Sequence, residues 1–187
     1  DNICKYIHLP VQSGNSRVLR LMNRTYDREW NQERVRAIYR IIPDCAISSD
    51  VITGFCTETE EEHEETLSMM EFVQYSMSYM FFYSERPGTL AARKYEDDVP
   101  LEVKKRRLQE VVHLQNQISR RRNQADIGKT YKVMIEGDSK KSNQHFRGRN
   151  SQNKMIVFPK RQGLNVGDYT EVVVMDATSA TLLGELA

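Results

Sequence analysis

The residues with the clearest chemical potential occur near the start of the chain, at residues 8–14, His-Leu-Pro-Val-Gln-Ser-Gly. Residues 3–7 alternate apolar and polar side chains as a half-buried β-strand does, and the proline and glycine then force the backbone out of the strand. Polar loops at the carboxyl ends of strands are where α/β sheets place ligands, so we expect the chain to begin within a catalytic domain. The amide of Gln12 and the hydroxyl of Ser13 donate and accept hydrogen bonds without charge, which suits ribose hydroxyls or the head group of an amino acid.

Two more polar segments follow predicted strands. Residues 46–55 are rich in Ile and Val, which predicts a buried strand, and Asp50 and Gly54 stand toward its end. Residues 78–83 predict a further strand, which leads into the turn 86–89. Side chains from separate parallel strands that converge on one rim form the sites of β/α barrels. Taken singly, each of these polar residues can be an ordinary loop residue whose hydrogen bonds are satisfied within the protein. The three segments together indicate a binding site.

The residue types around this rim indicate a nucleoside-like ligand with an amino-acid tail. Gly54 has no Cβ, so a flat base can approach its backbone closely. The guanidinium of Arg24, or that of Arg20, can pair with a carboxylate through two parallel hydrogen bonds. His8 stands at a strand end, where a hydrogen-bonded structural histidine is the more common case than an acid or a base.

The spacing of apolar residues predicts the elements that position these loops. Helices are predicted around residues 18–22, over 27–42 with Asp27 as N-cap, and from Thr59, where Thr-Glu-Glu-Glu is a capping-box pattern. Strand, helix, strand, helix, strand at this spacing implies parallel strands with right-handed crossovers. Pro100 then opens a long helix that ends near residue 123.

The last third of the chain has a different pattern. After Gly128, short segments typical of strands alternate with turn residues, at 130–135, 145–149, 155–158, 170–175 and 180–186. Five strands of this size match a small barrel of the OB type. The predicted fold class is therefore α/β, followed by a small all-β barrel.

Basic residues cluster in the first half of this last part. Between Asp126 and Arg161 there are nine basic residues against three acidic ones, whereas residues 162–187 contain four acidic residues and no basic one. Concentrated positive charge is expected of a surface that contacts phosphates. Basic runs also occur on the long helix, at 104–107 and 120–122, where a solvated helix face is the simpler interpretation.

The composition excludes several classes of protein. The 187 residues include 39% apolar and 28% charged residues, and the mean hydropathy is −0.64, values typical of a water-soluble globular protein. No run of about 18 apolar residues occurs, so no membrane span is expected. Cys4, Cys45 and Cys56 include no CxxC pair, so we expect free thiols in a reducing cytoplasm and no metal site in this chain.

Several segments, in this order, closely resemble the radical S-adenosylmethionine (SAM) methylthiotransferases. They are residues 8–14, 22–26, 49–55 with Glu58-Thr59, and 83–92, which includes an Arg-Pro-Gly-Thr turn. The resemblance continues through Glu136-Gly137, the Ser-Lys-Lys-Ser segment 139–142, Gly148-Arg149 and 157–159, which is similar to the TRAM domain that ends these enzymes. It spans essentially all 187 residues, and the order of the motifs makes it specific.

This resemblance implies a division of the chain and roles for its residues. Residues 1–99 are expected to be the C-terminal half of a partial β/α radical SAM barrel, 100–125 a connecting helix, and 126–187 an RNA-binding TRAM barrel of the OB-like kind. The expected SAM contacts are Gln12, Ser13, Arg24, Asp50, Gly54 and Phe82, the last on the strand expected against the adenine. The expected contacts with tRNA phosphates are Lys140, Lys141, Arg147 and Arg149. No catalytic residue is assigned.

The implied activity is that of a complete enzyme of which this chain is a part. Such an enzyme uses SAM and two 4Fe–4S clusters to methylthiolate carbon 2 of N6-isopentenyladenosine at position 37, beside the tRNA anticodon. The family's CxxxCxxC segment does not occur in this chain, so the cysteine ligands of both clusters are expected outside it. The implied partners are the tRNA anticodon stem-loop, the missing N-terminal part of the enzyme, a sulfur donor and an electron donor such as flavodoxin.

Three alternatives stay open. A second branch of the family acts on threonylcarbamoyladenosine in tRNA and shares the Arg-Pro-Gly-Thr turn. A third acts on a ribosomal protein and usually has an acidic pair after Tyr-Ser, where this chain has residues 85–87, Glu-Arg-Pro. The chain can also be a non-catalytic RNA-binding module. The Ser-Ser-Asp strand at 48–50 and the Ser-Lys-Lys-Ser loop favour the isopentenyladenosine branch.

One local departure from the family pattern concerns a cysteine. Where the family commonly has Pro-Gly before Glu-Thr, this chain has Cys56-Thr57 before Glu58-Thr59. The turn is therefore expected to differ locally, with Cys56 either near the site or, more commonly for this residue type, a buried thiol.

Overall fold

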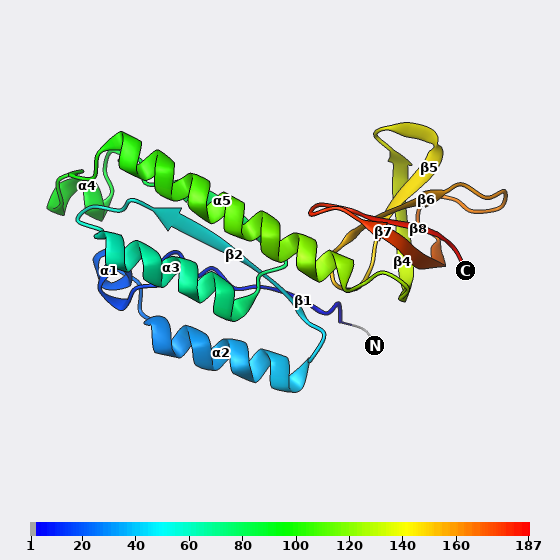
Figure 1. Cartoon of the computed structure of the whole chain (residues 1–187), viewed down its shortest axis with the longest axis horizontal. Helices are drawn as coiled ribbons and strands as arrows, with labels where there is room; N and C mark the ends of the chain where they lie inside the picture. Colours follow the sequence, from blue (N-terminus) through cyan, green and yellow to red (C-terminus); the bar gives the residue numbers. More distant parts are fainter. Residues whose placement is uncertain (1–2) are drawn as a thin grey trace. The chain divides into compact units, whose positions relative to one another are not determined.

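The computed structural model describes residues 3–187 and forms two compact units (Figure 1). The first, here called the α/β unit, comprises Ile7–Asn116. The second, the barrel unit, comprises Gln117–Ala187 together with residues 3–6. The boundary falls within the longest helix, between Asn116 and Gln117.

The α/β unit contains a three-stranded sheet in the order β1-β2-β3. The strands are β1 (Tyr6–His8), β2 (Ala46–Thr53) and β3 (Met77–Phe82), and β2 and β3 run parallel. The helices are α1 (Ser16–Leu21), α2 (Arg28–Ile41), α3 (Glu60–Val73), α4 (Leu90–Lys94) and α5 (Leu101–Gln124). The predicted alternation of strands and helices is confirmed, except that the sequence pattern did not predict α4, which follows the turn 86–89.

The first strand is shorter than its sequence pattern predicts and lies later in the chain. The expected strand covers residues 3–7, whereas β1 covers only Tyr6–His8. The N–H of Leu9 donates to the carbonyl of Ser48 at 2.8 Å, which fixes the parallel alignment with β2.

The predicted helix starts are confirmed in detail. The side chain of Asp27 accepts a hydrogen bond from the N–H of Trp30 at 2.8 Å and so caps α2. Thr59 and Glu62 form the reciprocal capping box at the start of α3. α5 begins directly after Pro100, as expected from the preference of proline for helix starts. These boundaries follow from local hydrogen-bonding chemistry that the sequence displays.

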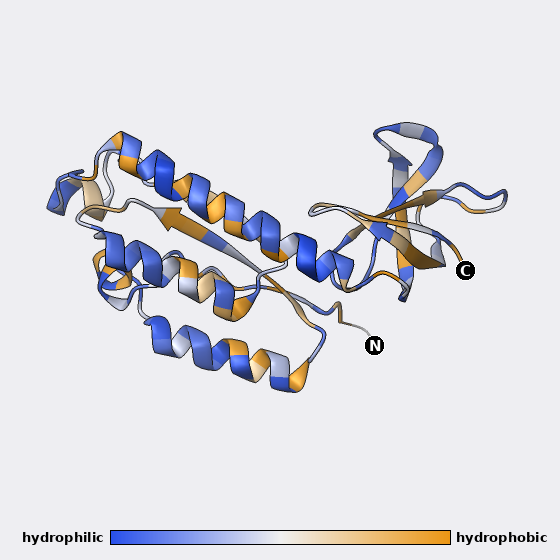
Figure 2. Cartoon of the chain, viewed as in Figure 1, coloured by the Kyte–Doolittle hydropathy of each residue, from blue (hydrophilic) through white to orange (hydrophobic). Residues whose placement is uncertain are grey.

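Hydropathy along the chain separates buried from exposed elements in the α/β unit (Figure 2). The carboxyl half of β2 is coloured hydrophobic, and Ile47 and Val51 of β2 are fully buried, as are Met69 and Met70 of α3. α5, in contrast, has 24 residues and is coloured mainly hydrophilic. Within residues 3–187, no helix combines the length and the apolar character needed to cross a membrane.

The barrel unit contains five strands that close in the order β4-β5-β6-β8-β7. They are β4 (Thr130–Ser139), β5 (Ser142–Arg149), β6 (Met155–Pro159), β7 (Tyr169–Ala177) and β8 (Leu182–Leu186). β4 and β5 extend further than predicted and meet in a tight hairpin at Lys140 and Lys141. The core of the barrel includes Val133, Ile156, Phe158 and Leu182, which are all fully buried. The expected small five-stranded barrel is therefore confirmed.

Candidate functional sites

A cavity of about 860 Å³ lies at the carboxyl end of the sheet in the α/β unit. It is lined by the loop after β1, the end of α1, the ends of β2 and β3, and the turn 86–89. Four of the six predicted SAM contacts are among its lining residues, namely Gln12, Arg24, Asp50 and Phe82. Ser13 and Gly54 are not. The strand ends thus bring most, though not all, of the predicted residues together.

Gln12 is held by its backbone and keeps its side chain available. Its N–H donates to Asp50 O at 2.9 Å, and its carbonyl accepts from Ile52 N–H at 2.8 Å, so that it pairs with β2 beyond the end of β1. Its φ of 66° is in the left-handed region, which turns the chain at this point. The side-chain amide lines the cavity and forms no hydrogen bond with any residue in 3–187. It can therefore bind a ligand without breaking a contact within the protein.

Asp50 lines the same cavity and is oriented by a histidine. His8 Nε2 lies 3.5 Å from Asp50 Oδ2, and His8 Nδ1 lies 2.8 Å from the hydroxyl of Ser48. The His8 ring also packs edge-on against Tyr79, with 6.2 Å between ring centroids. His8 is thus fixed by neighbours on β2 and β3, in agreement with its expected structural role.

Two arginines line this cavity, and sequence reasoning singled out only one of them as a site residue. Neither Arg24 nor Arg86 forms an ion pair with any residue in 3–187. Arg86 belongs to the turn 86–89, and the position of that turn after the third strand was the available signal. Because both guanidinium groups lack a carboxylate partner in the described chain, either can pair with an anionic part of a ligand.

Ser13 and the adjacent glycine attach the loop to α3 instead of lining the cavity. Ser13 is fully buried, and its hydroxyl lies 3.4 Å from that of Thr66, which also accepts the N–H of Gly14 at 2.9 Å. A Cβ on Gly14 would lie 2.4 Å from the carbonyl oxygen of Glu65. These residues therefore hold the loop so closely against the helix backbone that Gln12 has a fixed position.

Gly54 also lies outside the cavity, and a side chain from α5 occupies the space beside it. Its φ is 66°, and an added Cβ would lie 2.5 Å from Cγ of Lys104. Its N–H donates to Oε1 of Glu58 at 2.8 Å. A group therefore does approach Gly54 closely, as expected. That group is the aliphatic part of the Lys104 side chain and not the base of a ligand.

Half of the basic run at 104–107 is buried, which corrects the expectation of a solvated helix face. Lys104 and Arg107 are each 4% exposed. Arg107 Nη1 lies 3.0 Å from Oε1 of the buried Glu58, and Lys104 forms an ion pair with Asp97. Only the intervening pair, Lys105 and Arg106, keeps the exposure that the sequence interpretation predicts.

Burial controls the electrostatics of this region. Burial raises the pKa of Glu58 above its usual value, although the Gly54 N–H and Arg107 act in the opposite direction. Hydrogen bonds from Arg106 and Arg107 lower the pKa of the more exposed Glu60 to about 2. Cys56 is 1% exposed, and burial raises the pKa of its thiol. This thiol is therefore a buried one, outside the residues that line the cavity.

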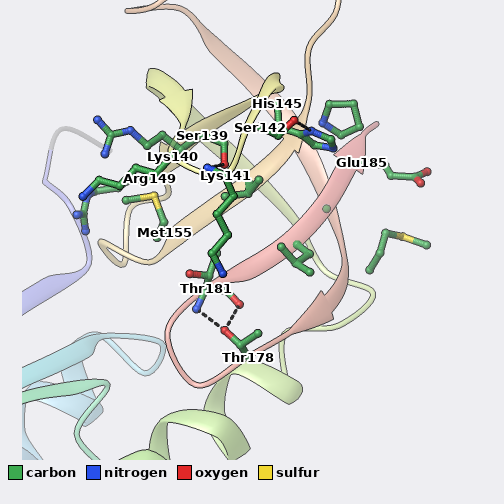
Figure 3. A pocket seen from close by; sticks show the side chains of 16 residues that line it. Ser139, Lys140, Lys141, Ser142, His145, Arg149, Met155, Thr178, Thr181 and Glu185 are labelled. Atoms are coloured by element: carbon green, nitrogen blue, oxygen red, sulfur yellow. Dashed lines mark hydrogen bonds between the residues drawn. The ribbon is translucent and has the colours of Figure 1, made fainter.

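A second hollow of about 860 Å³ lies on the barrel unit (Figure 3). All four predicted contacts for tRNA phosphates line it, namely Lys140, Lys141, Arg147 and Arg149. Figure 3 shows the hairpin residues Ser139 and Ser142 at one end of the hollow and Thr178 and Thr181 at the other. The β4–β5 hairpin thus brings these predicted residues to one surface.

Several acidic residues of the barrel unit pair with basic residues, whereas three of the four predicted phosphate contacts have no acidic partner among residues 3–187. Asp126 pairs with Lys129 and Lys154, and Asp138 pairs with Lys160. Among the predicted contacts, Arg149 pairs with Glu136 at 3.2 Å. Within residues 3–187, Lys140, Lys141 and Arg147 form no ion pair, and the buried Nε of Arg147 has no hydrogen-bond partner.

Comparison with known proteins identifies two family regions in the order expected from the motifs. Residues 1–70 match the radical SAM superfamily, and residues 124–187 match the TRAM domain. Coproporphyrinogen III oxidase (HemN) from Escherichia coli, a radical SAM enzyme, has a similar fold, with a TM-score of 0.53 at 22% identity over 90% of this chain and 41% of that protein.

Sequence relatives match along the whole chain. The tRNA-2-methylthio-N(6)-dimethylallyladenosine synthase of Amoebophilus asiaticus is 62% identical over 187 residues, which are 100% of this chain and 38% of the relative. The protein of the same name from Phocaeicola vulgatus is 55% identical over 184 residues, 98% of this chain and 40% of the relative. The chain thus spans about two fifths of the length of these curated relatives. Both family regions are thus matched in order, and the chain is similar along its whole length to these synthases.

Proposed function

We propose that this chain is part of an enzyme that attaches a methylthio group to carbon 2 of N6-isopentenyladenosine at position 37 of tRNA. The 62% identity along all 187 residues to a synthase of that modified nucleoside carries the proposal. Residues 1–99 contribute part of the radical SAM core, and residues 126–187 bind the tRNA anticodon stem-loop. Residues 100–125 form the helix that connects these two parts. The remainder of the enzyme, a sulfur donor and an electron donor such as flavodoxin complete the system in the cytoplasm.

The cavity of the α/β unit suits SAM by the chemistry of its lining. The unpaired amide of Gln12 and the carboxylate of Asp50 match ribose hydroxyls and an amino group, and the guanidinium of Arg24 matches the carboxylate. The rings of Phe81 and Phe82 provide an apolar surface for the adenine. A volume of about 860 Å³ is in the range of ligand pockets, which hold roughly 300–1,000 Å³.

The iron–sulfur clusters require ligands that the described part of the chain does not bring together. No group of three His, Cys, Asp or Glu side chains within residues 3–187 is arranged to hold a metal ion, so we place the cysteines of two 4Fe–4S clusters outside the chain. When bound, SAM and its cluster supply a radical that activates carbon 2, which acid–base chemistry does not readily functionalise. The residues of this chain bind and orient the cofactor and the tRNA.

Nucleoside analysis of tRNA tests the substrate. In a strain that lacks the gene, mass spectrometry of digested tRNA should show N6-isopentenyladenosine without its 2-methylthio group, and the wild-type gene should restore the group. Complementation with Asp50→Asn should restore less. Loss of a methylthio group from threonylcarbamoyladenosine, or from a ribosomal protein, would contradict the proposed substrate and favour another branch of the family.

Cofactor binding by the complete enzyme tests the cavity. Arg24→Ala should weaken SAM binding by about 1–3 kcal/mol, because a charged group of the ligand loses its hydrogen-bond partner. Arg20→Ala is the matched control, since Arg20 does not line the cavity and donates to Ser16 O instead. Isothermal titration calorimetry should show weaker SAM binding for Arg24→Ala than for Arg20→Ala. Equal SAM affinities of the two variants would contradict the assignment of Arg24 as a SAM contact.

A further inference from the structure

The hollow on the barrel has an apolar floor that phosphate binding does not require. Across three neighbouring strands, Arg147 of β5 lies opposite Val157 of β6, which in turn lies opposite Leu183 of β8. Arg149 lies opposite Met155 in the next row. All five residues line the hollow, so a column of basic side chains borders a column of aliphatic ones.

These aliphatic residues face outward by the alternation of the strands. Their neighbours Ile156, Phe158 and Leu182 are fully buried in the barrel core, so Met155, Val157 and Leu183 project from the opposite face. Leu183 remains 38% exposed, and Met175 of β7, which also lines the hollow, is 56% exposed. An exposed apolar patch bordered by cations marks a surface for a ligand with both a flat apolar part and negative charge.

The place of the hollow in the barrel identifies the class of ligand. It covers the second and third strands, β5 and β6, together with the loop between the first two strands and the loop between the last two. OB-type barrels bind oligonucleotides or oligosaccharides with this combination of surfaces. The charge of Lys140, Lys141 and Arg147, which have no acidic partner among residues 3–187, favours the polyanion.

Two polar side chains, His145 and Glu185, also line the hollow. His145 Nδ1 lies 2.9 Å from the hydroxyl of Ser142, and its Nε2 has no partner among residues 3–187. The carboxylate of Glu185 also lines the hollow and forms no ion pair in the described chain. A ring nitrogen and a carboxylate can bond the edge of a base, whereas a carboxylate repels a phosphate.

We propose that this hollow binds unpaired nucleotides of an RNA strand, with a base packed on Met155, Val157 and Leu183 and the adjoining phosphates on Lys140, Lys141 and Arg147. The inference rests on the proposed role of the barrel in binding tRNA and adds that the barrel contacts bases as well as phosphates. Base faces are covered by stacking in a duplex, so only an unpaired loop can present one to this floor. The anticodon loop is such a segment.

Fluorescence anisotropy with the 187-residue chain tests this inference. The probes are a labelled anticodon stem-loop RNA, the same RNA with abasic residues throughout its loop, and a blunt duplex of equal length. Leu183→Ser and, separately, Met155→Ser should weaken binding of the intact loop about five- to tenfold, because each removes an apolar side chain whose surface the bound base covers. Neither should change binding of the abasic or duplex probes.

Two control variants separate base contact from charge. Val166→Ser removes an apolar side chain that is 62% exposed but lies outside the hollow, and it should leave all affinities unchanged. The double variant Lys140→Ala with Lys141→Ala should weaken binding of all three probes and reduce the slope of log K against log salt by about 0.7–0.9 per lysine.

The outcomes distinguish this inference from the function on which it rests. Equal binding of the intact and abasic loops, or no effect of Leu183→Ser and Met155→Ser, would overturn base contact while RNA binding by the barrel stands. Failure of the wild-type chain to bind any probe at low salt would overturn the RNA-binding role itself, and base contact with it.

Discussion

Each unit contains a buried carboxylate, and the two are stabilised to different extents. In the α/β unit, Glu58 accepts hydrogen bonds from Gly54 N–H at 2.8 Å and from Arg107 at 3.0 Å. Burial raises the pKa of Glu58, and these two donors do not fully offset it. The ionised form is therefore less favourable here than in water.

In the barrel unit, Asp126 has more donors. Lys154 Nζ lies 2.5 Å from one of its oxygens, and Lys129 Nζ at 3.0 Å and the Tyr131 hydroxyl at 2.8 Å bond the other. Burial raises the pKa of Asp126, but the hydrogen bonds from Lys154, Lys129 and Tyr131 outweigh it, so the pKa lies below the usual value. The three donors around Asp126 therefore outweigh the effect of burial on its pKa, whereas the one cation and one backbone amide at Glu58 do not.

The contrast implies that the two units depend on their ion pairs to different degrees. A buried charge that loses its only ionic partner is left with a desolvation cost and no compensation. Glu58 is in that position with Arg107, whereas Asp126 would keep two donors if any one were removed. The α/β unit should therefore be the more sensitive to a single substitution.

The largest expected effect is that of Arg107→Met. It leaves Glu58 buried without its cation and should lower the free energy of unfolding of the α/β unit by about 3–5 kcal/mol. The chain has one tryptophan, Trp30, which lies in this unit and stacks on Tyr26 with 5.6 Å between ring centroids. Urea unfolding followed by tryptophan fluorescence therefore reports on this unit.

Arg106→Met provides the matched control. Arg106 shares Glu60 as a partner with Arg107, but its side chain is 45% exposed, against 4% for Arg107. Pairs of this exposure contribute about 0–1 kcal/mol. Comparable losses in the two variants would contradict the special role assigned to the buried pair.

These two arginines also show where sequence reasoning ends. The run 104–107 has the composition of a solvated helix face, yet Arg107 is buried and pairs with Glu58, which lies 49 positions away in the sequence. Ser13 is similar, because its partner Thr66 lies 53 positions away. By contrast, the caps at Asp27 and Thr59 depend on residues three positions away and were predictable. Hydrogen bonds between residues a few positions apart could therefore be predicted from the sequence, whereas contacts between residues about 50 positions apart could not.

The apolar floor of the barrel hollow escaped prediction for a different reason. Residues 155–158, Met-Ile-Val-Phe, are apolar at every position, so the pattern does not say which side chains face the core. The cross-strand register supplies that information by pairing Val157 with Arg147. The predicted phosphate contacts were easier to find, since lysines beside a turn stand out in any sequence.

A smaller effect is expected from Lys154→Met in the barrel. Asp126 keeps Lys129 and Tyr131, so the free energy of unfolding should fall by about 1–3 kcal/mol, the usual range for one lost partner of a buried group. Amide hydrogen exchange of barrel residues such as Val172 measures it without interference from the α/β unit. Lys129→Met, which removes a lysine whose side chain is 55% exposed, should cost less. A loss as large as that of Arg107→Met would show that the additional donors do not protect Asp126.

The smallest expected effect is on the pH dependence, and it has opposite signs in the two units. Asp126 has a folded pKa below its unfolded value of 3.8, so its stabilisation is complete above that pH and is lost as the pH falls through the folded pKa. Glu58 has a folded pKa above its unfolded value of 4.5, so its contribution is complete below pH 4.5 and declines as the pH rises through the folded pKa.

Difference measurements isolate these contributions from those of other carboxylates and of His63, whose pKa is lowered by burial. The stability advantage of the wild type over Asp126→Asn should shrink below pH 3.8, whereas its advantage over Glu58→Gln should shrink as the pH rises above 4.5. Exchange rates in the barrel and tryptophan fluorescence in the α/β unit, each recorded from pH 3 to about pH 7, give the two profiles. If both advantages shrink in the same direction, then the number of donors does not decide how a buried carboxylate of this chain titrates, and the contrast between the two units must have another cause.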